Sequence, residues 1–215
     1  MHNSNLPLAL TMGDPAGIGP EIIVKSINKL KMTNYVVFGD AMVFENIIKI
    51  LGIPLRLNCI NSLSEAIFDK DVLNLLVTSE LKSKPDFGET SKESGRASYD
   101  AILETIKLAK QKKLHGVVTA PINKKALNLA NISFPGHTEI FSEHSKSNNV
   151  SMMLCNDSIK TVLVTLHCSM AEALKKICVE NEFKAIKNAY IGANMFGIKD
   201  PIIAVAALNP HAGEM

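Results

Sequence analysis

Short apolar runs alternate along the chain with longer segments in which apolar residues recur every three or four positions. The short runs predict buried strands at 8–12, 35–38, 73–78, 116–119, 152–154, 161–166 and 202–208. The segments with helical spacing predict helices at 21–30, 42–51, 97–114, 170–177 and 182–196. This alternation is typical of an α/β fold, in which a mostly parallel sheet carries helices on both faces.

The segment 79–94 interrupts the alternation. It is rich in Ser, Lys, Glu and Gly and contains Pro85, so we expect an exposed connection that marks the edge of a subdomain. The length of 215 residues is compatible with one large domain or two interleaved subdomains.

Composition excludes several classes of protein. The 23 basic and 21 acidic residues give a net charge of +2 and are scattered, which argues against nucleic acid as a partner. No apolar run approaches the roughly 18 residues of a membrane span, and the N-terminus lacks a signal-peptide pattern, so we expect a cytoplasmic protein. The four cysteines lie far apart without a C-x-x-C pair and are interpreted as buried, reduced thiols.

A glycine-rich turn follows the first predicted strand. Gly17 and Gly19, with Asp40 about twenty residues later, imitate a dinucleotide fingerprint. The third glycine is replaced by Ile22, and Pro20 removes an amide that could face a pyrophosphate. No Gly-Lys-Ser/Thr follows, so a nucleotide P-loop is excluded as well. A turn that needs glycine for backbone geometry alone remains an open interpretation.

Two histidines follow predicted strands. His167 comes after 161–166 and His211 comes after 202–208. Ligands of open α/β sheets gather at the carboxyl ends of the strands, and neutral imidazole is a ligand that Zn²⁺ accepts, so the pair predicts part of a divalent metal site. A capping or packing role for either histidine stays open. The neighbouring Cys168 is expected to be buried, and His2, His115 and His144 to be surface residues.

His137 and Thr138 lie where another helix is predicted to begin, between Gly136 and Glu139. Thr138 is expected to cap a helix that runs from Glu139 toward Ser145. Free amides and the helix dipole at such a position favour a phosphate or a carboxylate. The alternative is a simple helix cap beside an exposed histidine.

Five ordered motifs together resemble the 4-hydroxythreonine-4-phosphate dehydrogenase family of pyridoxal phosphate biosynthesis. The motifs are LTMGDPAGIGPE at 10–21, TAPINK at 119–124, PGHTE at 135–139, TLHCS at 165–169 and NPHAGE at 209–214. The resemblance implies a fold like that of isocitrate and isopropylmalate dehydrogenases rather than a Rossmann fold. It also implies that NAD oxidises a phosphorylated amino-hydroxy acid, 4-phosphooxy-L-threonine, with decarboxylation, in vitamin B6 synthesis.

The resemblance also assigns residues. His137 and Thr138 are expected to contact the substrate, and His167 and His211 to bind a divalent metal, Zn²⁺ or alternatively Mg²⁺ or Co²⁺. The family implies a homodimer whose active site is shared. It continues beyond NPHAGE, so residues 1–215 are expected to represent the N-terminal two-thirds of the enzyme. A third metal histidine, a phosphate-binding Lys, Asn and Arg, and much of the NAD site belong to the part that is absent.

Three alternatives remain open at this point. A paralogous dehydrogenase would act on phospho-threonate or phospho-erythronate. A fragment with an incomplete ligand set would only bind a metabolite or dimerise. An acyl-phosphate transferase on a related fold would be indifferent to NAD.

Overall fold

A computed structural model describes residues 6–212 and divides the chain into two units, Met1–Lys146 and Ser147–Met215. The predicted connection at 79–94 lies inside the first of these units. The interleaving of subdomains stays a prediction.

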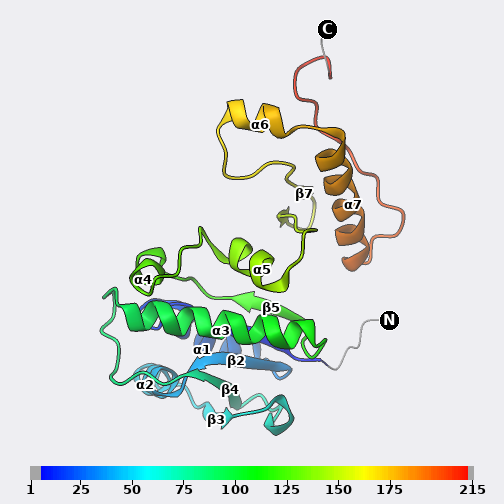
Figure 1. Ribbon diagram of the computed structural model, residues 1–215. Coiled ribbons are helices and arrows are strands. Elements are labelled where there is room, and N and C mark those ends of the chain that lie inside the picture. The colour runs from blue at the N-terminus through cyan, green and yellow to red at the C-terminus, as the bar shows by residue number, and fades with distance from the viewer. Residues whose placement is uncertain (1–5, 213–215) are drawn as a thin grey trace. The chain divides into compact units, whose positions relative to one another are not determined.

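The first unit is built on a five-stranded sheet (Figure 1). Its strands stand in the order β3-β4-β2-β1-β5, and every neighbouring pair is parallel. The strands are β1 (Leu8–Thr11), β2 (Tyr35–Asp40), β3 (Arg56–Ile60), β4 (Val72–Ser79) and β5 (Gly116–Thr119). The central strands β2 and β1 are buried almost throughout, which explains their uninterrupted apolar sequences.

Helices cover both faces of this sheet. Alternate strand residues such as Tyr35 and Val37 pack with α1 (Gly19–Leu30) and α2 (Ala41–Leu51). The intervening residues Val36 and Phe38 pack with α3 (Lys92–Lys110), the long helix that runs along the sheet in Figure 1. The unit also contains η1 (Leu63–Glu65), α4 (Lys124–Leu129) and α5 (His137–Ser145). The predicted α/β class with a mostly parallel sheet is therefore confirmed.

A third apolar cluster joins α3, α4 and α5. Ile102 and Ile106 of α3 meet Leu127 of α4 and Ile140 of α5, and all of them are buried. Gly95 allows α3 to approach α4 closely, because a Cβ atom there would lie 2.0 Å from the carbonyl oxygen of Ala126. This cluster holds α5 against α3 within the first unit.

The second unit contains little regular sheet. The strands β6 (Met153–Cys155) and β7 (Lys160–Val162) form an antiparallel pair. They are followed by α6 (Met170–Lys176) and α7 (Val179–Met195), and α7 contacts β7. Among the described residues of this unit, Ala185 and Ala193 are the ones that are buried.

One predicted strand is absent from the described part of the chain, and one observed strand was not predicted. The run 202–208 is not a strand, since it pairs with none of the strands that the structure describes, and Ile202 is fully exposed. Apolar composition favours a strand, but a strand exists only where a neighbouring backbone completes the hydrogen bonds. The sequence missed β3, which lies at the edge of the sheet and alternates polar with apolar residues.

The expected side-chain environments also change at several positions. Cys59, Cys155 and Cys178 are exposed and Cys168 is partly exposed, so the prediction of buried thiols is wrong, and all four thiols are free. His144 is half-buried rather than on the surface. Across residues 6–212, no helix is both long and apolar enough to cross a membrane.

Candidate functional site

His137 and Thr138 are the first two residues of α5, so this helix begins two residues earlier than predicted. The residue before the helix is Gly136, whose backbone is extended. Gly136 occupies the N-cap position, and no side chain there accepts a hydrogen bond from the first amides of α5. Thr138 is therefore not the cap, because a capping side chain must precede the first helical residue. The first amides of α5 donate no hydrogen bond to a capping side chain, and free amides at a helix start favour an anion.

The imidazole of His137 is one of two side chains of the first unit with a buried polar atom that has no hydrogen-bond partner among the described residues, the other being Thr11. In His137 this atom is Nε2. Burial lowers the pKa of His137, because desolvation disfavours the charged imidazolium. The unpaired nitrogen of a neutral imidazole can donate a hydrogen bond to a ligand or accept one from it, depending on the tautomer.

The glycine-rich turn after β1 has a structural explanation. Gly13 has a φ of +72°, and a Cβ atom there would lie 2.4 Å from the carbonyl oxygen of Pro121. Asp40, the acidic residue of the false fingerprint, caps α2 through the amide of Val43 and also accepts from the amide of Leu81 at 2.8 Å. Both carboxylate oxygens of Asp40 thus serve the fold, in agreement with the exclusion of a dinucleotide fingerprint.

His167 lies in the turn between β7 and α6. It does not directly follow a strand as predicted, because β7 ends at Val162. Its backbone is left-handed, with a φ of 49°, and its side chain is exposed. The turn is stabilised by a capping box, in which the Ser169 hydroxyl accepts from the Glu172 amide and the Glu172 carboxylate accepts from the Ser169 amide.

His211 lies in a turn beyond the extended segment 202–208, again not at a strand end. The amide of Ala212 closes this turn by donating to the carbonyl of Asn209 at 3.1 Å, and His211 is exposed. His167 and His211 both belong to the second unit, whereas His137 and Thr138 belong to the first.

The imidazoles of His167 and His211 are suitable ligands for Zn²⁺, but two protein ligands are too few for a catalytic zinc site. Within residues 6–212, no group of three His, Cys, Asp or Glu side chains could hold a metal ion. A catalytic zinc site normally takes three protein ligands. The described residues therefore offer two candidate ligands and not a complete site.

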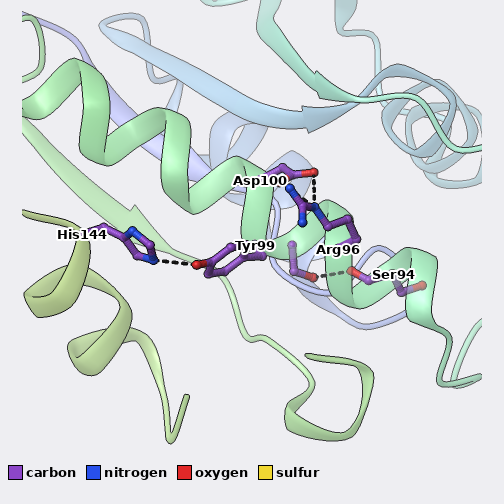
Figure 2. Close-up of polar contacts among 6 residues, drawn as sticks. Ser94, Arg96, Tyr99, Asp100 and His144 are labelled. Carbon is purple, nitrogen blue, oxygen red and sulfur yellow. Dashed lines mark hydrogen bonds and ion pairs between the residues drawn. The ribbon is translucent and has the colours of Figure 1, made fainter. Parts of the chain in front are cut away.

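Sequence reasoning missed a polar and aromatic cluster at the contact between α3 and α5 (Figure 2). The Tyr99 hydroxyl and the His144 Nε2 atom share a hydrogen bond at 2.5 Å. Arg96 lies 6.0 Å from the centre of the Tyr99 ring and forms an ion pair with Asp100 at 2.9 Å. The contact joins positions 45 residues apart, and no local motif marks it.

Comparison with known proteins identifies the family. Residues 31–215 match the family described as pyridoxal phosphate biosynthetic protein PdxA. The chain is 49% identical to the 4-hydroxythreonine-4-phosphate dehydrogenase of Beijerinckia indica, over 97% of this chain and 62% of that relative. It is 33% identical to the D-threonate 4-phosphate dehydrogenase of Cupriavidus necator, over 96% of this chain and 63% of that protein. The chain thus spans less than two-thirds of these relatives.

A solved structure supports the same assignment. The crystal structure of 4-hydroxythreonine-4-phosphate dehydrogenase from Klebsiella pneumoniae superimposes with a TM-score of 0.87 at 33% identity. The match covers 97% of this chain and 65% of that one. The chain belongs to the PdxA family of pyridoxal phosphate biosynthetic proteins.

Proposed function

We propose that this chain carries part of the active site of an NAD-dependent dehydrogenase that oxidises and decarboxylates 4-phosphooxy-L-threonine in vitamin B6 synthesis. The observation that carries the proposal is the 49% identity to a relative with that dehydrogenase name. The geometry supports it at His137, whose buried Nε2 atom lacks a partner in the described structure.

The first unit would recognise the substrate. His137 would form a hydrogen bond with a polar group of the substrate. Thr138 would contact the substrate from the next position of α5. The uncapped amides of α5 would favour an anionic group of the substrate. Since burial lowers the pKa of His137, the imidazole would bind in its neutral form near neutral pH.

The second unit would provide His167 and His211 as two ligands of a divalent metal, with Zn²⁺ as the first candidate. When bound, such a metal would favour ionisation of the substrate hydroxyl, and the nicotinamide of NAD would accept the hydride. The two histidines lie in turns, where the backbone holds each imidazole outside a helix or strand.

The metal assignment is tested by removing each ligand. His167→Ala and His211→Ala are each expected to weaken Zn²⁺ binding about tenfold or more, measured by calorimetry on the full chain. His115→Ala is the matched control, since His115 is also an exposed histidine but has no proposed role. Equal Zn²⁺ affinity in all of these variants would contradict the assignment.

The activity is tested by following NAD reduction by the full chain with added Zn²⁺ or Mg²⁺. Turnover of 4-phosphooxy-L-threonine that is lost in His137→Ala would support the proposal. The second candidate is a D-threonate 4-phosphate dehydrogenase, favoured by the likeness to the Cupriavidus necator protein. A preference for D-threonate 4-phosphate over the amino substrate would select it.

We also propose that two copies of the chain pair as a homodimer. On α7, Val179, Phe183, Ile186 and Tyr190 recur at spacings of four, three and four, and all are exposed, Val179 to 87% and Phe183 to 66%. In an antiparallel pair, Phe183 of one copy would face Ile186 of the other, and Glu180 would lie beside Lys187. Phe183→Asp is then expected to shift the mass measured by light scattering from dimer to monomer.

A further inference from the structure

The contact between α3 and α5 contains three rings, Tyr99, Phe134 and His144, which we call the aromatic clamp. The Tyr99 and Phe134 rings are stacked, with centroids 6.2 Å apart. The His144 ring meets both of them edge-on, at 5.6 Å from Tyr99 and 5.9 Å from Phe134. The hydrogen bond between Tyr99 and His144, drawn in Figure 2, fixes the orientation of the histidine ring within the clamp.

The clamp holds the chain on both sides of His137. Phe134 lies three residues before His137, and His144 lies seven residues after it. In a helix, residues seven apart lie on one face two turns apart, so His144 and His137 share a face of α5. The fully buried Ile140 lies between them on that face and packs in the α3 cluster.

The α3 side of the clamp is itself held in place. The Arg96 guanidinium lies over the Tyr99 ring, and the Arg96–Asp100 ion pair keeps it there (Figure 2). On the α5 side, the Lys110 ammonium donates to the carbonyl of His144 at 3.5 Å. Tyr99 is thus an anchored residue whose hydroxyl sets the position of α5 at its C-terminal end.

We propose that Tyr99 and His144 are positioning residues that hold α5 on α3 and thereby keep the imidazole of His137 buried and correctly placed for the substrate. The inference rests on the proposed role of His137, but its structural part can be measured without any ligand.

The test combines Tyr99→Phe, His144→Leu and the double variant in the full chain. Hydrogen exchange of the α5 amides is expected to be roughly two- to tenfold faster in each single variant, because each loses the partly buried hydrogen bond between Tyr99 and His144. The increase in α5 exchange in the double variant is expected to be much smaller than the sum of the two single increases, since both variants remove the same hydrogen bond. His115→Leu, at an exposed histidine outside α3 and α5, is the matched control and leaves α5 unchanged.

A second measurement separates positioning from simple stability. The imidazole of His137 is titrated by NMR, and its midpoint is expected to rise toward the ordinary value of 6.5 in Tyr99→Phe and His144→Leu, because a loosened α5 admits water. An unchanged His137 midpoint, or unchanged α5 exchange, would overturn the proposal. A His137 variant that binds substrate normally would instead refute the proposed function and leave the clamp result standing.

Discussion

At the scale of single residues, the burial of His137 makes the stability of the protein depend on pH in a defined direction. The folded imidazole has a lowered pKa, so below about pH 6.5 the unfolded chain binds protons that the folded chain does not. The full contribution of His137 to the free energy of unfolding is therefore present above that pH and is lost as the pH falls through the lowered pKa. In His137→Gln this pH-dependent loss of stability is absent, because glutamine does not titrate.

Urea unfolding of the wild type and His137→Gln at a series of pH values measures the effect. The wild type should lose stability relative to the variant as the solution is acidified from about pH 8 to about pH 5. His115→Gln, which makes the same substitution at an exposed histidine, is the control. A wild-type curve parallel to that of His137→Gln would show that His137 is hydrated in the folded protein.

At the scale of elements, the junction between β1 and α1 depends on Gly13. Its left-handed backbone and the nearby carbonyl of Pro121 leave no room for a Cβ atom. Gly13→Ala is expected to lower the free energy of unfolding by about 3 kcal/mol or more, since strain and steric overlap add. Gly52→Ala is the control, because Gly52 is also left-handed but has open space around it, and it should cost about 1 kcal/mol. Chemical denaturation that gave equal losses would contradict the close approach at Gly13.

The sequence predicted those strands and helices that have a local pattern of apolar residues. β1, β2 and β4 appeared as apolar runs because parallel strands covered by helices on both faces need apolar side chains along their length. Of the two edge strands, β5 was found from its short apolar run, whereas β3 was missed because its residues alternate polar with apolar. The run 202–208 was wrongly predicted because strand pairing is not a local property. Thr138 was misassigned because the cap position depends on the backbone of Gly136.

The candidate site was predictable only as far as its motifs. His137, Thr138, His167 and His211 lie in turns or at a helix start with marked sequences, so the chain alone selected them as candidates, and their roles stay predictions. Tyr99 and His144 were not found, because their contact depends on how α3 packs on α5 and leaves no local pattern. The burial of the His137 Nε2 atom likewise depends on packing, and no spacing of residues could reveal it.

At the scale of the whole molecule, the two units differ in how much apolar surface they bury. The first unit has three apolar clusters, whereas the described part of the second buries only two alanines. Amide protection depends on such burial, so hydrogen exchange is expected to be at least about tenfold slower in the sheet of the first unit than in α6 and α7. Mass spectrometry of deuterium uptake across peptides of both units provides the measurement. Equal protection in the two units would contradict the expectation and would indicate that an intermolecular contact covers α7.

The exposed thiols of Cys59, Cys155 and Cys178 have a practical consequence for measurements of self-association. Air oxidation can join accessible cysteines of separate molecules, which produces covalent oligomers that light scattering does not distinguish from a native dimer. A true pairing through α7 would persist in excess reductant and respond to Phe183→Asp. Disulfide-linked oligomers would instead dissociate to single chains on reduction. The redox state of the buffer therefore determines whether light scattering reports native pairing or oxidation.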